Sequence, residues 1–241
     1  VLANLDATVQ NTGWEFELNA RPFSKGKFQW ETSFNITFPK NKLITFPGLE
    51  GSTYSNTYVI GHPTSIVKLF NLEGIDPKTG TYIFTDYNGD GKISSADDDI
   101  RVENIGVNFF GGLSSRLHYE NWDFSFLFQF VKQKRRNYNY IIPSPGIMNN
   151  LPVEALDVWS PENPAGFYQP YKANASPNHS IFQNSTASVA DGSFIRLKNV
   201  ELAYNIPLKN TSFRSIRIYF QGQNLITWTK YFGIDPEFTT I

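Results

Sequence analysis

Apolar and polar residues alternate along much of this chain. In the segment 27–38 the apolar face consists of Phe28, Trp30, Phe34, Ile36 and Phe38. The intervening positions are Gln29, Glu31, Ser33, Asn35 and Thr37. Because successive side chains of a β-strand point to opposite faces, this period of two predicts a strand that separates an apolar side from a polar side.

The same period recurs in "NWDFSFLFQFVKQ", where the apolar face consists of Trp122, Phe124, Phe126, Phe128 and Phe130. Across the chain the pattern predicts six strands, at about 13–22, 27–39, 105–118, 122–133, 193–205 and 215–228. Most exceed the usual five or six residues of a strand. They match the roughly 9–11 residues that a tilted strand needs to cross a bilayer. We therefore predict an all-β, antiparallel fold.

The connections between these strands alternate in length. The links after the first, third and fifth strands are short, whereas 40–104 and 134–192 are long. All short links thus fall at one end of the sheet, as in outer-membrane barrels. Within the first long loop, "DPKTG" between apolar runs predicts a small hairpin. In the second, 151–164 predicts one short helix that ends before Pro161, and the rest is expected to be irregular.

Composition narrows the function classes. Aromatic residues make up 16% of the 241 residues, as expected for strands and for the aromatic girdles of a barrel. The formal net charge of −1 gives no basic excess for nucleic acid. Without Cys there is no disulfide framework or thiolate metal site, and the three His residues lack metal-ligand spacing. We find no nucleophile, phosphate-loop or catalytic-triad motif, so we do not expect an enzyme.

Alternation alone does not separate a membrane barrel from a soluble β-sandwich, whose core strands also alternate. The alternative is therefore a soluble, calcium-stabilised β-sandwich that binds glycans. It requires the Phe-rich faces to be buried between two sheets.

The segment "TDYNGDGKISSADDD", residues 85–99, matches an EF-hand-type coordination loop. Side-chain oxygens fall at positions 1, 3, 5, 9 and 12, Gly91 falls at position 6, and position 7 offers its backbone carbonyl. The predicted calcium ligands in the loop 86–97 are Asp86, Asn88, Asp90, Lys92, Ser94 and Asp97. Asp replaces the usual Glu at position 12 and no helix pair flanks the loop. We therefore expect a structural calcium rather than a sensor.

The basic run "KQKRR", residues 132–136, follows an apolar strand. We interpret it as a solvated loop base at the outer rim of a barrel, near lipid phosphates, rather than as a nucleic-acid site.

Several segments together resemble the C-terminal region of SusC/RagA-type TonB-linked outer-membrane proteins of Bacteroidetes. They are "NTGWEFELNA", "NKLITFPGLEGSTYSNTYVIGHP", "GIDPKTGTYIFTDYNGDGKI", "FFGGLSSRLHYENWDFSFLFQFVKQ", "DGSFIRLKNVELAYNIP" and "IYFQGQNLITWTKYFGIDPE". The match runs almost from end to end, so residues 1–241 are interpreted as one C-terminal barrel segment. The last two segments look like closing strands of the family, and we expect one further strand after Ile241.

The resemblance implies a barrel of about 22 strands, closed by a plug domain that precedes this segment. It implies import of oligosaccharides, glycans or peptides, with energy relayed by TonB and a SusD-like surface lipoprotein as a lid. The loops 40–104 and 134–192 would be extracellular. Residues expected to line the polar interior are Gln29, Glu31, Asn35 and Gln129. Loop aromatics considered for sugar stacking are Tyr54, Tyr58, Trp159, Phe167 and Tyr168, and no substrate-binding residue is assigned.

Overall fold

The computed structural model describes residues 5–95, 97–174, 176–209 and 213–237. One antiparallel sheet dominates it. Its long strands are β1 (Thr8–Phe23), β2 (Phe28–Thr45), β7 (Val107–Tyr119), β8 (Trp122–Arg136), β10 (Phe194–Ile206) and β11 (Ile216–Thr229). They pair in this order, and the short β9 (Val189–Asp191) adds to the end of β8. All six predicted strands are confirmed, and the first two extend several residues further toward the long-loop end.

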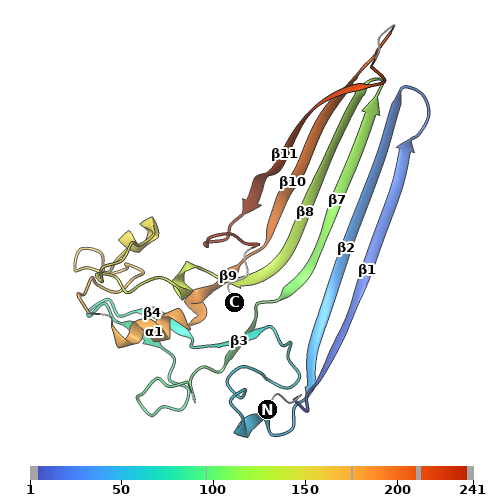
Figure 1. The fold of residues 1–241 in the computed structure, drawn as a ribbon. Coiled ribbons are helices and arrows are strands. Elements are labelled where there is room, and N and C mark those ends of the chain that lie inside the picture. The colour runs from blue at the N-terminus through green and yellow to red at the C-terminus, as the bar shows by residue number, and fades with distance from the viewer. Residues whose placement is uncertain (1–4, 96, 175, 210–212, 238–241) are drawn as a thin grey trace.

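The long strands lie side by side, with the short turns at one end and the long connections at the other (Figure 1). Residues 24–27 and 120–121 form two of the short connections, and the third joins β10 to β11. The predicted separation of short and long connections is therefore confirmed.

Strand register aligns the apolar side chains in rows. One row, read across six strands, contains Leu18, Phe34, Leu113, Phe128, Leu197 and Ile226. In the next row Gly111 lies between Ile36 and Phe130. A Cβ at Gly111 would lie 2.6 Å from a ring carbon of Phe130. The glycine therefore leaves room for that ring, which stacks on Phe34 with centroids 5.8 Å apart.

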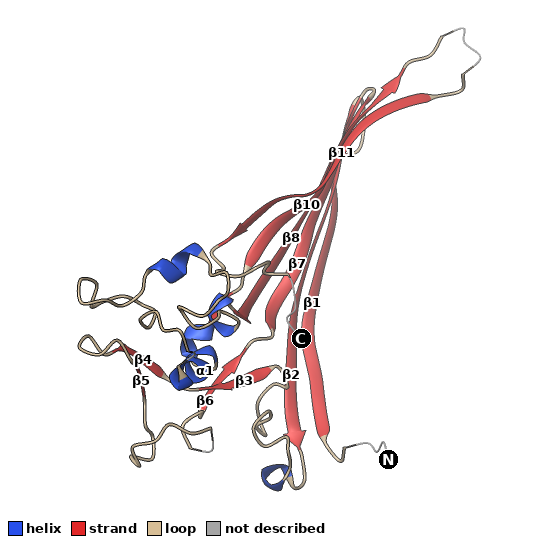
Figure 2. Ribbon diagram, turned by 60° about the vertical axis from the view of Figure 1, so that its left-hand side comes forward, coloured by secondary structure: helices blue, strands red, loops and turns tan. Residues whose placement is uncertain are grey.

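The apolar face of this sheet faces outward. Trp14 on β1 is 73% exposed and Phe220 on β11 is 76% exposed. The main sheet forms a single twisted layer (Figure 2). The other strands of the described chain form two short pairs within the loops. These are β3 (Ile66–Leu69) with β6 (Arg101–Asn104), and β4 (Leu72–Ile75) with β5 (Tyr82–Phe84). The sandwich alternative requires a second sheet that covers the apolar face. Within the described residues there is no such sheet.

The two long loops share one hydrophobic core. Its buried residues are Phe70, Tyr82, Phe84, Ile142, Ala155, Val158, Tyr168 and Phe182. The predicted hairpin is confirmed as β4–β5, whose turn is held by Asp76 Oδ1 accepting the backbone N–H of Lys78 at 2.9 Å. We call this unit, built from 66–104 and 137–188, the loop body.

Helical structure is confined to short pieces. The predicted helix in 151–164 is only a 3₁₀ turn, η3 (Val153–Leu156), because Pro152 and Pro161 bracket it closely. The α-helix α1 (Pro177–Gln183) was not predicted. The remaining 3₁₀ turns are η1 (Leu49–Gly51), η2 (Tyr138–Tyr140) and η4 (Thr186–Ser188). No helix in the described chain has the length and apolar character needed to span a bilayer.

Candidate functional site

The polar face of the main sheet gathers the residues predicted to line an interior. One register row across the six strands contains Glu17, Asn35, Gly112, Gln129, Arg196 and Thr227. Asn35 Oδ1 accepts the backbone N–H of Gly112 at 3.0 Å, which fixes the amide against the sheet. Gln129 Oε1 is buried and has no hydrogen-bond partner among the described residues. Gln29 and Glu31 share this face at the short-turn end. The predicted placement is thus confirmed, and the lining role stays a prediction.

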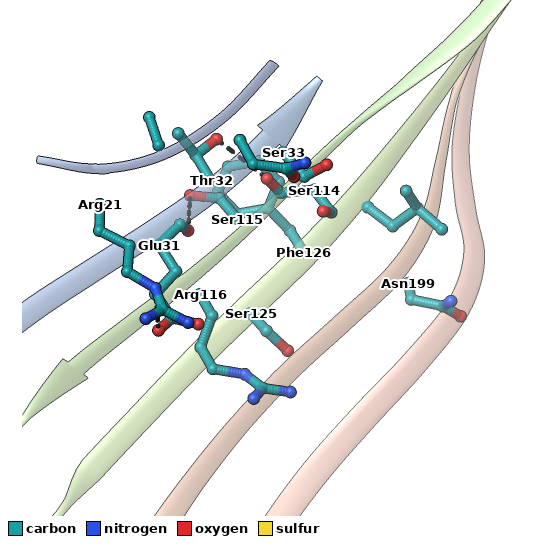
Figure 3. A pocket seen from close by; sticks show the side chains of 13 residues that line it. Arg21, Glu31, Thr32, Ser33, Ser114, Ser115, Arg116, Ser125, Phe126 and Asn199 are labelled. Atoms are coloured by element: carbon teal, nitrogen blue, oxygen red, sulfur yellow. Dashed lines mark hydrogen bonds and ion pairs between the residues drawn. The ribbon is translucent and has the colours of Figure 1, made fainter. Parts of the chain in front are cut away.

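Charged side chains cluster on the same face toward the short-turn end (Figure 3). Arg21 and Glu31 form an ion pair at 3.0 Å, and Arg116 lies opposite Glu31 in the register. Further along the row, Glu201 pairs with Arg217 at 2.5 Å. The first three residues line a hollow of about 610 Å³. Its lining combines both signs of charge with hydroxyl groups such as those of Thr32, Ser114 and Ser115.

A segment after β11 folds back onto the polar face at the long-loop end. We call residues 230–237 the strap. Arg196 forms ion pairs with Asp235 at 2.7 Å and with Glu237 at 2.5 Å, and Lys198 reaches Glu237 at 2.7 Å. The buried Gln133 donates through Nε2 to the carbonyl oxygen of Pro236 at 2.7 Å. Sequence reasoning missed this contact, although "RLK" and "DPE" offered matching charges.

The predicted cation loop forms a compact turn. Asp86 accepts the backbone N–H groups of Gly89 at 2.7 Å and Gly91 at 2.8 Å. Asn88 accepts from Asp90 N at 3.0 Å. Gly89 and Gly91 both adopt left-handed φ values, 74° and 79°, which glycine allows without strain.

A residue outside the predicted ligand set closes this loop. Asp98 is fully buried and accepts the backbone N–H groups of Tyr87 at 2.9 Å and Ser94 at 2.8 Å. The predicted ligand Asp97 instead accepts from Ser94 Oγ at 3.3 Å. No group of three or more acidic or His side chains in the described chain is arranged to hold a metal. Calcium binding by the six predicted residues therefore stays a prediction.

The loop aromatics predicted to stack on a sugar differ in solvent exposure. Tyr168 is 2% exposed and its hydroxyl donates to Asn139 Oδ1 at 2.8 Å, so it is excluded as a stacking residue. Burial raises its pKa to about 12. Trp159 donates through Nε1 to the carbonyl oxygen of Pro77 at 3.2 Å, and Phe167 remains exposed.

A separate aromatic pair lies on the first long loop. Tyr54 is exposed and stacks on Tyr58, with centroids 6.0 Å apart. Of the predicted stacking residues, Phe167 and Tyr54 are the exposed ones, at 42% and 39%.

The basic run 132–136 is not a solvated loop. It continues strand β8 and pairs with β9. Lys134 bridges to Glu103 at 2.5 Å, and Arg136 lies 4.4 Å from the ring centroid of Tyr140. Lys132 bonds Asp191 at 2.7 Å, and this bond lowers the pKa of Asp191 to about 2. The interpretation as a loop base was wrong, because strand β8 continues through this run. The alternation of apolar residues stops there, and ion pairs replace it within the same strand.

Long amphipathic antiparallel strands with one exposed apolar face define a segment of β-barrel wall. No family model matches the chain. It is 29% identical over 262 residues to TonB-dependent receptor P3 of Formosa agariphila, covering 95% of this chain and 25% of that protein. It is 28% identical over 253 residues to TonB-dependent receptor SusC of Bacteroides thetaiotaomicron, covering 95% and 24%.

The fold agrees with these relatives. A structure of the RagAB peptide transporter aligns with a TM-score of 0.76 and 23% identity, covering 96% of this chain and 27% of that one. The resemblance to SusC/RagA-type TonB-dependent receptors is therefore confirmed. The chain spans about a quarter of the length of the curated relatives it matches.

Proposed function

We propose that this chain is the C-terminal part of the wall of an outer-membrane, TonB-dependent importer and carries no enzymatic activity. The supporting observation is the main sheet, with one exposed apolar face and one polar face along strands of 13–18 residues. In a bilayer the apolar face contacts lipid tails and the polar face lines the interior.

The edges of the sheet favour the same proposal. β1 and β11 each pair on one side only within the described chain. Backbone N–H and C=O groups on an open edge are not tolerated in hydrocarbon, so the sheet must continue into further strands. A longer barrel of about 22 strands satisfies both edges.

In this importer the substrate crosses an interior lined by Gln29, Glu31, Asn35 and Gln129 on the polar face. The loop body and the strap stand at the extracellular end. A SusD-like lipoprotein covers that end, and TonB supplies the energy through a plug domain outside this segment. The substrate is an oligosaccharide, glycan or peptide, and similarity to a chain of a peptide transporter supports the peptide.

A matched pair of substitutions tests the membrane orientation. Phe128 faces outward and Gln129 faces the polar side at the same height of β8. Phe128→Arg should destabilise the inserted barrel by about 2–4 kcal/mol, as arginine does on a lipid face near the midplane. Gln129→Arg should be tolerated. Insertion is read from heat-modifiable electrophoretic mobility of the full-length protein in outer membranes. Equal tolerance of both substitutions, or monodisperse protein without detergent, would favour the soluble alternative.

Uptake assays separate the substrates. Cells that lack the full-length protein are compared with complemented cells for accumulation of labelled oligopeptides and oligosaccharides. A substrate that depends both on this protein and on TonB is the cargo. If accumulation of neither class of substrate depends on this protein and on TonB, the importer proposal is contradicted.

A further inference from the structure

Toward the long-loop side, three strands of the main sheet carry the same pattern. An aromatic residue on the apolar face is followed two residues later by lysine, at Phe38–Lys40, Phe130–Lys132 and Trp228–Lys230. Because alternate residues share a face, Lys40 and Lys132 lie on the same side of their strands as the aromatic residue before them. Lys230 directly follows the last residue of β11.

Register brings two of these pairs together. Phe130, Ile195 and Trp228 lie opposite one another across β8, β10 and β11. Lys132 and Lys230 lie two residues further along the chain toward the long-loop end. All five residues, together with Phe109, line a groove of about 760 Å³ on the outer face. The groove thus combines an apolar floor with a cationic rim.

Aromatic contacts connect this groove to the third pair. The rings of Phe38 and Phe109 lie 5.6 Å apart, and those of Phe109 and Phe130 lie 6.5 Å apart. The aromatic row therefore runs from β2 to β8, with Lys40 and Lys132 beyond it at the same end.

The rim has an excess of positive charge. Lys132 shares a bond with Asp191, the one acidic residue lining the groove in the described chain. Lys40 and Lys230 form no ion pair with any described residue. Lys42, which follows Lys40 on the same face of β2, is also exposed and forms none.

The height of these lysines matches a headgroup layer. On β2 the exposed large apolar residues are Phe28, Phe38 and, beyond the lysines, Ile44; the stretch from Phe28 to Phe38, which precedes Lys40, is about 33 Å long at roughly 3.3 Å per residue. At a tilt of about 40° this corresponds to an apolar band of about 25 Å, the usual height for a membrane barrel. The lysines lie a few ångströms beyond the band, at the depth of lipid phosphates.

We propose that this outer groove binds a lipid with a phosphate headgroup in the leaflet on the long-loop side. The acyl chain lies on Phe130, Ile195 and Trp228, and the phosphate lies between Lys132 and Lys230. Lys40 and Lys42 extend the cationic rim around the barrel. The inference rests on the proposed membrane insertion.

Native mass spectrometry of the full-length protein in detergent tests the site. Dioleoyl phosphatidic acid is titrated against dioleoyl phosphatidylcholine, glycerol 3-phosphate and inorganic phosphate. The variant is Lys132→Gln with Lys230→Gln. The control is Lys78→Gln with Lys172→Gln, two exposed loop lysines that remove the same charge.

Retention of phosphatidic acid should fall about 25-fold in the rim variant, or about five-fold per lysine, and should be unchanged in the control. Equal losses in both variants would overturn the site. Equal competition by glycerol 3-phosphate or inorganic phosphate would show an anion contact without the lipid groove, and this also overturns it. Insertion of both variants into bilayers distinguishes failure of this inference from failure of the proposed function.

Discussion

Tyr82 and Phe182 lie face to face, with ring centroids 4.3 Å apart and an interplanar angle of 5°. Tyr82 belongs to β5 in the first long loop and Phe182 to α1 in the second. The stack therefore ties two connections that leave the sheet at different strands. It gives the long-loop end a folded unit instead of two independent loops.

Removing this stack should open the loop body. Phe182 is fully buried, so Phe182→Ala should cost about 3–5 kcal/mol of local stability. We expect faster proteolysis within 137–188, with unchanged heat-modifiable mobility of the barrel. The control is Leu156→Ala, since Leu156 lies in the same segment, is 71% exposed and does not belong to the shared core. Equal protease resistance of the Phe182 variant and the wild type would contradict a shared core.

Acid should loosen the loop body through His179. Its Nε2 bonds the carbonyl oxygen of Ile142 at 2.7 Å, and its Nδ1 is buried without a partner among the described residues. Burial lowers the pKa of His179 from its ordinary value of 6.5. Because the folded pKa lies below the unfolded one, this contribution to stability is present above pH 6.5. It is lost as the pH falls from there toward the lowered folded pKa.

Hydrogen exchange in 137–188 at pH 7.5 and pH 5, corrected for intrinsic exchange rates, measures this effect. His179→Gln should reduce the difference in protection between the two pH values. His118→Gln, on the main sheet, should leave that difference intact. A pH response that persists unchanged in the His179 variant would rule out this residue as its source.

The main sheet was predictable because its signal is local. Phe34 and Ile36 share the apolar face and alternate with polar residues, so ten consecutive residues are enough to predict the strand. Register then follows from short turns such as the one between β7 and β8. The burial of Tyr168 could not be predicted in this way, since its partner Asn139 lies 29 residues away in irregular chain. The helix α1 spans only seven residues, too few for a helical period to emerge.

The cation loop shows a different limit. Residue spacing identified Asp86 and Asp90, but the adjacent acids 97–99 are equivalent as a pattern. Only the fold distinguishes Asp98, which is buried, from its neighbour Asp97. Residue spacing identifies a turn that brings oxygen ligands together. Packing decides which carboxylate accepts the backbone hydrogen bonds that hold the loop.

Calcium should stabilise this loop if the predicted ligands bind it. Asp86→Ala with Asp90→Ala should abolish any shift in thermal midpoint produced by EDTA. Asp76→Ala is the control, because Asp76 caps the β4–β5 turn through Lys78 N and lies outside the predicted ligand set. It should lower stability without changing the response to EDTA. Wild-type protein that ignores EDTA would contradict calcium loading.

Breaking the ion pairs of Arg196 should release the strap. The Arg196 side chain is 9% exposed and bonds both Asp235 and Glu237. Hydrogen bonds to a charged group contribute about 1.5–3 kcal/mol, so Arg196→Met should raise exchange of the strap amides roughly thirty-fold. The Glu237 amide, which donates to Asp235 Oδ1 at 2.8 Å, is the most direct reporter. Arg217→Met removes an ion pair at the opposite end of the polar face and should leave the strap protected. If the two variants exchange alike, the strap is held by Gln133 and its backbone contacts rather than by charge.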